Sequence, residues 1–297
     1  MELCAIKKII VRMPNWIGDL VMALPVLTDL RKHYPNAEIT VMCQANSAPI
    51  LHENPIIDEL FSFTRIKGLF RRIRERNITL KLKEGKYDLG ILLTNSFSSA
   101  WLFWQGNVKN IIGFKGNKRS FLLNYPIAFP EERKTTHLVS TYKKLLTPLG
   151  IPVSDTAPSL FVKEEEIDAI WDFVKRFDIS KDQKIIGINP GAAYGSAKCW
   201  LPERFSSVAK KLIEHDPSYV VVFVGDLSHK PLLSSICAKL PKRVINLAGQ
   251  TTLRELVALT KICSAFLTND SGPMHIASSL GIPLIALFGS TDPVVTG

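Results

Sequence analysis

The sequence has no cysteine pattern of the kind that holds a metal ion or a disulfide framework. Five cysteines occur, none in a CxxC pair, and they are spread singly along the chain at Cys4, Cys43, Cys199, Cys237 and Cys263. An odd number of isolated cysteines, without Cys/His spacing of the zinc type, is typical of a reduced cytoplasmic protein. The pattern argues against a disulfide-rich secreted domain and against a structural zinc site.

Long hydrophobic runs are also absent. No apolar run reaches the roughly 18–20 residues that a membrane-spanning helix needs. The hydrophobic stretch near the N-terminus is short and ends in the polar segment MPNWIGD, so we interpret it as a first strand and not as a signal peptide. With 46% hydrophobic and 22% charged residues, the composition is that of an ordinary globular protein.

The common nucleotide-binding and nucleic-acid-binding signatures are missing as well. There is no P-loop, no G-x-G-x-x-G fingerprint and no repeat of short period. No RRM, helix-turn-helix or zinc signature is present, which argues against nucleic-acid binding. A length of 297 residues favours two domains of medium size.

What the sequence does contain is a regular alternation of short apolar runs with segments of helical period, typical of parallel sheets wrapped by helices. The strand candidates are 7–13, 38–44, 58–63, 87–95 and 110–114 in the first half, and 184–191, 219–225, 243–249, 264–270 and 283–289 in the second. Near Gly150 the run GIPVSDTAPSL is typical of a linker. We therefore predict an α/β protein with two doubly wound domains, over residues 1–155 and 156–297.

The net charge of +10 is unevenly distributed. The segment KGLFRRIRERNITLKLKEGK, residues 67–86, places six of its eight basic residues around Leu69, Phe70 and Ile73: Arg71, Arg72, Arg74, Arg76, Lys81 and Lys83. The segment is either a solvated helix face or a surface attracted to anions, whether lipid headgroups or nucleic acid. Charge alone does not choose between these.

Ligands of doubly wound sheets bind beyond the carboxyl ends of the strands, so the residues that follow each strand carry the functional signal. After the first strand, in PNWIGDLV, Gly18 permits a tight turn and Asp19 stands where a helix begins. Asp19 is either a helix N-cap or a general base that accepts a proton from a hydroxyl group. Trp16 is either a core residue or a platform for a sugar ring.

The loop NPGAAYGSAKCW, between a strand and the helix that starts at Pro202, is the second such site. Gly191 and Gly195 let backbone N–H groups approach a phosphate, and the helix N-terminus adds a favourable dipole. Lys198 would then act as a point charge on a pyrophosphate. The alternative is tight-turn chemistry alone.

Two more strand ends carry polar residues. In VVVFVGDLSHK, Asp226 either accepts hydrogen bonds from ribose hydroxyls or caps the next helix. In TNDSGPMHIAS, the N–H groups of Ser271 and Gly272 are candidates to bind an anion at a helix N-terminus. Asp270 and His275 are close enough in sequence to face one bound group, although a histidine at such a place can also be purely structural.

Taken together, six segments resemble the lipopolysaccharide heptosyltransferases, and among them the heptosyltransferase II group. They are PNWIGDLVMALPVL, TNSFSSA, GFKGNKRSFLLN, NPGAAYGSAKCW, NLAGQTTL and TNDSGPMHIAS, in this order along nearly the whole chain. The resemblance implies a GT-B fold, in which two Rossmann-like domains face each other across a cleft. It implies that the first domain binds the acceptor and the second binds ADP-heptose.

The resemblance further implies an inverting transfer of L-glycero-D-manno-heptose from ADP-heptose to the first heptose of the lipopolysaccharide inner core. It implies that Asp19 is the general base and that Lys198 lies over the diphosphate of the donor. The remaining donor contacts are expected from Gly191, Tyr194, Gly195, Ser196, Asp226, Thr251, Asp270, Ser271, Gly272, Met274 and His275. The acceptor contacts are expected from Asn15, Trp16, Asn95, Ser96, Lys115 and Arg119.

No acidic pair resembles the metal-binding DxD of other glycosyltransferases, so we expect neither a bound metal nor a cofactor. The anionic lipid A–Kdo–heptose acceptor would place the protein in the cytoplasm, peripheral on the inner face of the inner membrane. Two features depart from the family. Ser228 stands where an acidic residue is usual, and the chain ends at FGSTDPVVTG, so the C-terminal return helices are expected to be absent. The alternatives are heptosyltransferase I or III, another GT-B transferase, or a catalytically weak nucleotide-sugar-binding relative.

Overall fold

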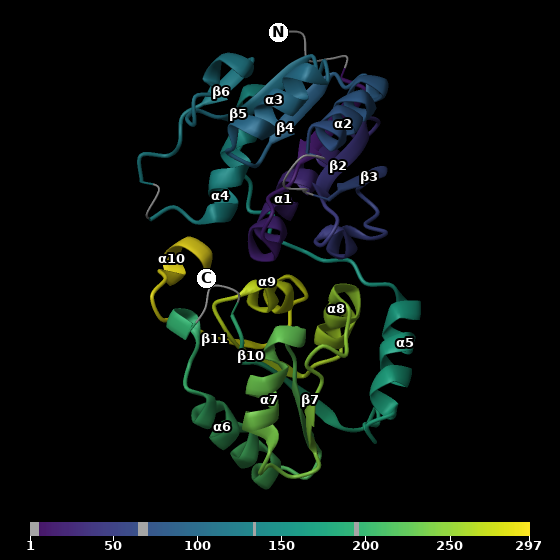
Figure 1. Cartoon of the computed structure of the whole chain (residues 1–297), viewed down its shortest axis with the longest axis vertical. Helices are drawn as coiled ribbons and strands as arrows, with labels where there is room; N and C mark the ends of the chain where they lie inside the picture. The colour runs from purple at the N-terminus through teal and green to yellow at the C-terminus, as the bar shows by residue number, and fades with distance from the viewer. Residues whose placement is uncertain (1–5, 65–70, 133–134, 193–195) are drawn as a thin grey trace. The chain divides into compact units, whose positions relative to one another are not determined.

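The computed structural model describes residues 6–64, 71–132, 135–192 and 196–297. It divides the chain into two compact units (Figure 1). The first comprises Met1–Ser159 with Val294–Thr296, and the second comprises Leu160–Pro293 with Gly297. The division falls a few residues after the boundary that the sequence suggests.

The first unit contains a six-stranded sheet in which every neighbouring pair of strands is parallel. Its strands are β1 (Lys8–Arg12), β2 (Glu38–Gln44), β3 (Glu59–Phe63), β4 (Leu89–Leu92), β5 (Asn110–Phe114) and β6 (Tyr125–Ile127). Their order is β3-β2-β1-β4-β5-β6. β1 and β4 are almost wholly buried because runs such as IIV and LGIL are apolar on both faces, which a sheet covered by helices requires.

Helices cover both faces of this sheet. They are α1 (Ile17–His33), α2 (Arg71–Gly85), α3 (Phe97–Gln105) and α4 (Leu138–Lys143), with the short turns η2 (Ala48–Leu51), η3 (Ser120–Leu122) and η4 (Lys144–Leu149). α2 and α3 share one apolar core with the strands, in which Leu82 and Phe103 take part. α1 packs with α4. Because crossovers are right-handed and the strand order runs both ways from β1, α1 lies on the face opposite to α3.

The basic segment 67–86 coincides in large part with α2. Its first residues, 67–70, lie outside the described residues. In the later part of the helix, Ile78 and Leu82 are buried in the core of the first unit. Lys81 lies with its ammonium 5.4 Å from the ring centre of Phe61, so this basic side chain packs over the protein's own sheet.

Strand β6 was not expected from the sequence. It has three residues, Tyr-Pro-Ile, and its Pro126 pairs opposite Gly113 of β5. A proline has no N–H to donate to a ladder, so it is tolerated only where one side of the strand is unpaired. β6 is the edge strand of the sheet, so the proline is tolerated there. The strand was not predicted because three residues are too few to form an apolar run.

The second unit repeats the plan with five parallel strands in the order β11-β10-β7-β8-β9. They are β7 (Lys184–Asn189), β8 (Tyr219–Phe223), β9 (Val244–Asn246), β10 (Ala265–Asn269) and β11 (Leu284–Leu287). Its helices are α5 (Glu164–Lys175), α6 (Pro202–His215), α7 (Lys230–Cys237), α8 (Leu253–Lys261) and α9 (Gly272–Ser279), and its short turns are η5 (Ser196–Lys198) and η6 (Leu227–His229). The last helix of the chain, α10 (Pro293–Thr296), belongs to the first unit except for Pro293.

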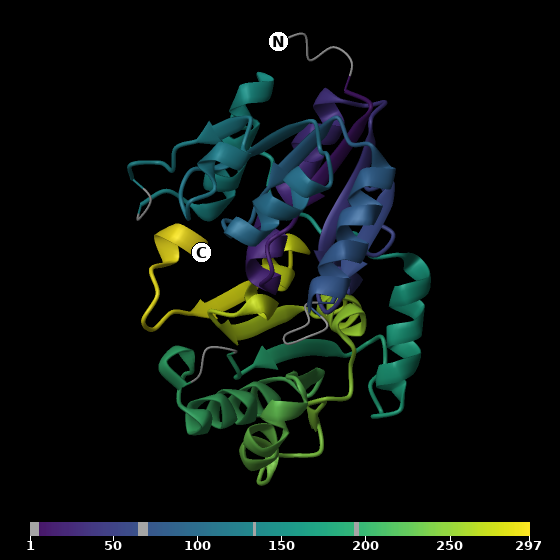
Figure 2. The ribbon, with the colours of Figure 1, turned by 45° about the horizontal axis from the view of Figure 1, so that its top comes forward.

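The helices of the second unit also lie on both faces of their sheet (Figure 2). α6 and α7 contribute Phe205 and Leu233 to one core, whereas α5 and α8 contribute Val174 and Leu259 to the other. The prediction of two doubly wound parallel sheets is thus confirmed. In such sheets the carboxyl ends of all strands lie at one edge, and ligands bind at that edge where the strand order changes direction. This change of direction is beside β1 in the first sheet and beside β7 in the second.

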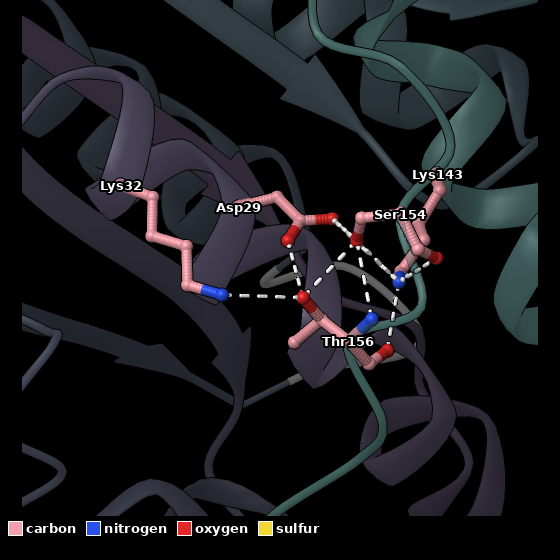
Figure 3. Close-up of polar contacts among 5 residues, drawn as sticks. All are labelled: Asp29, Lys32, Lys143, Ser154 and Thr156. Atoms are coloured by element: carbon pink, nitrogen blue, oxygen red, sulfur yellow. Dashed lines mark hydrogen bonds and ion pairs between the residues drawn. The ribbon is translucent and has the colours of Figure 1, made fainter.

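The first part of the predicted linker is held tightly by the first unit. Ser154 and Thr156 donate hydroxyl hydrogen bonds of 2.8 Å each to the two carboxylate oxygens of Asp29 (Figure 3). The Lys143 ammonium donates to the backbone carbonyls of Ser154 and Thr156, at 2.7 Å each. Asp29 and Lys143 are buried and lie 3.7 Å apart, so each charge is compensated inside the network. The chain is therefore fixed through Thr156.

Candidate active site

The loop after β1 places Asp19 inside a helix and not before it. α1 begins at Ile17, and the carbonyl of Trp16 accepts the first helical hydrogen bond, from the Leu20 N–H at 2.9 Å. Trp16 is therefore the N-cap, and Asp19 is the third residue of the helix. Asp19 is half-buried, and the positive end of the helix dipole favours a negative charge at this place. The alternative that Asp19 is an N-cap does not hold.

Two other residues of this loop were expected to contact an acceptor. The buried Arg12 guanidinium donates to the side-chain oxygen of Asn15 at 2.6 Å and lies 4.8 Å from the ring centre of Phe63. Asn15 is thus held in one orientation. Trp16 is 55% exposed, so it is not a core residue and its ring is accessible.

The ends of β4 and β5 bring further predicted acceptor residues to the same edge of the first sheet. Ser96 is the N-cap of α3, because its hydroxyl accepts from the Ser99 N–H at 3.2 Å. The carbonyl of Asn95 accepts from the Asn117 side chain at 2.6 Å. Lys115 is exposed in the loop that follows β5.

Arg119 differs from expectation. It is fully buried, and its guanidinium donates to the carbonyls of Phe114 and Thr94 and, at 3.1 Å, to the side chain of Asn95. Burial lowers the pKa of Arg119 to about 10. Because the guanidinium is enclosed in this way, it is not accessible to the acceptor substrate. Its contacts instead fix the strand ends that carry Asn95 and the loop with Lys115.

We expect Arg119→Met to lower the free energy of unfolding by about 2–4 kcal/mol, because the substitution leaves buried carbonyl groups without donors. Chemical denaturation measures this loss. Lys115→Met is the matched control, since it removes an exposed charge from the same loop and should change stability by less than about 0.5 kcal/mol. Equal losses in the two variants would contradict a structural role for Arg119.

In the second unit two buried asparagines hold the loop that follows β7. The Asn269 amide donates to the carbonyl of Pro190 at 2.7 Å, and its oxygen accepts from the Trp200 N–H at 3.0 Å. The Asn189 amide nitrogen lies 3.0 Å from the hydroxyl of Ser271 and 3.1 Å from the carbonyl of Gly191. Asn189 was not among the site residues predicted from the sequence. The available signal was an amide at the very end of a buried apolar strand.

Lys198 and Asp270, which are 72 residues apart in the sequence, meet at this edge. The Lys198 ammonium lies 2.6 Å from a carboxylate oxygen of Asp270, and the same oxygen accepts from the Thr291 hydroxyl at 2.6 Å. Burial by itself raises the pKa of Asp270, but the hydrogen bonds from Lys198 and Thr291 outweigh it and leave that pKa below the usual value. The carboxylate therefore stays ionised at neutral pH. The stability gained from this ionised pair is lost as the pH falls through the lowered pKa.

Other predicted donor residues lie on the segments that follow β7 and β10, as this pair does. His275 is buried in α9, which begins at Gly272 after the N-cap Ser271. Ser196 belongs to the same short turn as Lys198, while Tyr194 and Gly195 lie outside the described residues. Met274, another residue expected to contact the donor, has a buried side chain that is only 3% exposed.

At the ends of β8 and β9 the two predicted donor residues, Asp226 and Thr251, lie at the starts of helical segments. The Asp226 carboxylate accepts from the N–H and hydroxyl of Ser228, at 2.9 and 2.6 Å, so it caps η6. Thr251 directly precedes Thr252, the N-cap of α8. His229 follows the same strand as Asp226 and was not among the predicted site residues. A Cβ on Gly191 would lie 2.6 Å from its Nε2 atom, so the imidazole packs against the backbone of the phosphate-loop candidate.

Chemically, this edge of the second unit is suited to an anion. A lysine, a helix N-terminus at α9 and a close-packed glycine backbone are all groups that favour phosphate. Within residues 6–64, 71–132, 135–192 and 196–297 there is no group of three His, Cys, Asp or Glu side chains suited to a metal ion. In those same ranges no helix is long and apolar enough to cross a membrane.

Comparison with known proteins identifies the family. Residues 76–297 match the model of glycosyltransferase family 9 (heptosyltransferase), which is well over half of the chain. The chain belongs to glycosyltransferase family 9. It is 32% identical to lipopolysaccharide heptosyltransferase 2 of Escherichia coli, an alignment that covers 97% of this chain and 84% of that protein. It is 31% identical to lipooligosaccharide heptosyltransferase 2 of Haemophilus influenzae, over 95% and 83% of the two chains.

The fold of this family 9 chain agrees with a solved relative. The structure of E. coli ADP-heptose LPS heptosyltransferase II superimposes with a TM-score of 0.85 at 32% identity, over 97% of this chain and 87% of that one. The resemblance that the six motifs indicate is therefore confirmed, and the protein is a glycosyltransferase of the heptosyltransferase family.

Proposed function

We propose that this family 9 chain is a heptosyltransferase II, which transfers L-glycero-D-manno-heptose from ADP-heptose to the first heptose of the lipopolysaccharide inner core. The observation that carries the proposal is the alignment, at 31–32% identity over almost the whole chain, with proteins named heptosyltransferase 2. Support from the site is the convergence of Lys198 and Asp270 with a helix N-terminus beyond the second sheet.

In the proposed reaction, a hydroxyl oxygen of the acceptor heptose attacks the anomeric carbon of the donor. The proton of that hydroxyl passes to the Asp19 carboxylate. The bond from the anomeric carbon to the phosphate oxygen breaks, ADP leaves with the electron pair, and the configuration inverts. Asp19 suits the role of base because it lies in the first turn of α1, the helix that follows β1, where it is half-buried and is not the N-cap.

Lys198 would stabilise the charge that develops on the leaving diphosphate. Its contact with Asp270 is compatible with this role, because an ammonium group has three N–H donors and only one is needed for that carboxylate. Asp270 would then hold Lys198 in position for the donor. A lysine and backbone N–H groups can meet this charge without a metal ion, and we propose a metal-independent reaction.

The acceptor assigned by this proposal is the lipid A–Kdo–heptose molecule, an anionic lipid. We therefore also propose that the protein works in the cytoplasm, at the inner face of the inner membrane. The first unit would bind the acceptor and the second the nucleotide-sugar.

A transfer assay with defined acceptors tests the function. The full chain is incubated with ADP-heptose and with lipid acceptors that end in Kdo, in the first heptose or in the second heptose, and the products are analysed by mass. We expect one heptose to be added, and only to the acceptor that ends in the first heptose. Addition to the Kdo-terminated acceptor would indicate heptosyltransferase I. Addition to none of them would contradict the proposal.

A further inference from the structure

One side of α3 carries a row of aromatic side chains that the protein does not bury. Phe97, Trp101 and Trp104 are spaced four and three residues apart, so they lie on one face of the helix. They are 41%, 36% and 52% exposed. From the turn that follows β5, Phe121 joins them and is 76% exposed. We call these four residues the aromatic ridge.

The ridge is an ordered array. The rings of Trp101 and Trp104 are stacked with centroids 5.0 Å apart, and those of Phe97 and Trp101 are stacked at 6.1 Å. Phe121 lies 6.3 Å from Phe97. The opposite side of the helix is anchored, because Phe103 is buried and packs so closely over Gly90 that a Cβ there would lie 2.8 Å from its ring. The exposure of the ridge thus follows from the way α3 is seated on the sheet.

Such a surface is unusual for a protein face that meets only water. Single exposed apolar residues are common, but a contiguous group of large aromatic side chains marks a place of interaction. Tryptophan in particular is favoured at the boundary between lipid and water, where its ring is buried and its N–H remains hydrated.

The charge around the ridge fits an anionic partner. Residues 89–130, which include α3, β5, η3 and β6, contain no Asp or Glu at all. Lys115 and Lys118 are exposed in the loop before Phe121, and that loop is tied to the start of α3 by the hydrogen bond from Asn117 to the Asn95 carbonyl. Aromatic rings beside lysines are the combination that binds a membrane surface with anionic headgroups. A second copy of the same face would oppose its own positive charge.

We propose that the aromatic ridge inserts into the headgroup region of an anionic bilayer, with Lys115 and Lys118 on the lipid phosphates. The choice of partner rests on the proposed function, whose acceptor is a membrane lipid. Because Phe97 directly follows Asn95 and Ser96, the ridge starts at the strand ends where acceptor contacts are expected. A bilayer held on α3 would therefore present its sugar-bearing lipids at that edge of the first unit.

Vesicle binding of the full chain tests this. The vesicles contain equal parts phosphatidylcholine and phosphatidylglycerol, and the variants are Trp101→Ser with Trp104→Ser, and Phe161→Ser as a control of matched exposure at 39% in the second unit. Loss of the two indoles that enter the lipid should weaken the partition coefficient about tenfold, whereas the control should bind as the wild type does. High salt should weaken binding of the wild type but leave an apolar part of it that the double variant lacks.

Lipids brominated on the acyl chains give a second readout that does not depend on fold stability. They should quench wild-type tryptophan fluorescence, and the quenching should be much smaller in Trp101→Phe with Trp104→Phe, which keeps the aromatic surface and the binding. Unchanged binding in the serine variant, or equal quenching in the phenylalanine variant, would overturn the proposal. So would a wild-type dimer that the serine variant dissociates, since the ridge would then be a subunit interface.

Transfer to a soluble, deacylated acceptor separates this proposal from the proposed function. The serine variant should retain wild-type transfer to that acceptor, because Trp101 and Trp104 lie along the helix away from the strand ends. If the wild type binds vesicles through the ridge but transfers no heptose to any acceptor, the proposed function fails and the membrane surface stands.

Discussion

Replacing Asp19 with asparagine should reduce the rate of heptose transfer by a factor of roughly 10²–10⁴, the range that a general base contributes. The amide keeps the shape of the carboxylate but accepts no proton from the attacking hydroxyl. Affinity for ADP, measured by calorimetry, should be nearly unchanged, because we propose that the nucleotide is bound by the other unit. Asp19→Ala should behave in the same way.

The control for the Asp19 variants is a variant that also removes a negative charge from the first turn of a helix, but away from the candidate site. Glu164 provides it, since it is an exposed acid in the first turn of α5. Glu164→Gln should cost at most about 1 kcal/mol of stability through the helix dipole and leave transfer unchanged. If ADP affinity in the Asp19 variants fell as far as turnover does, Asp19 would be a structural residue of α1 and the proposed mechanism would fail.

Replacing Lys198 with methionine should lower kcat by a factor of roughly 10²–10³, which corresponds to about 3–4 kcal/mol of lost charge stabilisation on the leaving diphosphate. The same variant should also be less stable, because it leaves the Asp270 carboxylate, 6% exposed, without its ammonium partner. Activity and stability therefore change together in this single variant, and the two causes must be separated.

A double variant separates them. Lys198→Met with Asp270→Asn removes both charges of the ion pair, so thermal unfolding should return toward that of the wild type. Transfer should stay low because no cation faces the diphosphate. If the double variant regained both stability and transfer, the ion pair would be a structural feature only, and Lys198 would have no part in the reaction.

Much of the fold is readable from the sequence because it depends on local patterns. Runs such as KIIGIN and YVVVF are apolar on both faces, and this predicts buried parallel strands at the positions where β7 and β8 occur. The helix that begins at Pro202 is equally clear, with a proline at its first position. The strand β6 is not readable, because three residues with a central proline give no periodic signal.

The candidate site divides in the same manner. Gly191, Lys198 and Asp270 could be assigned to one edge because parallel strands bring their carboxyl ends together. For Arg119 the expectation failed, since an arginine in a polar loop carries no local mark of burial, and its full enclosure arises from carbonyls at two separate strand ends. For Asp226 the sequence offered a ribose contact or a cap, and the cap became visible only in the folded chain, through the hydrogen bond from the Ser228 N–H to the carboxylate. The ribose contact stays a prediction.

Hydrophobic period and the identity of neighbouring residues were enough to establish the succession of strands and helices, the motifs at the strand ends and, through those motifs, the family. The meeting of Lys198 with Asp270 across 72 residues required the folded chain, and so did the outward direction of Trp101 and Trp104 beside the buried Phe103. Burial and pairing between distant residues depend on how each helix is seated on its sheet. In the run AWLFW every residue is apolar, so the sequence does not indicate which side of the helix packs on the sheet and which side is exposed.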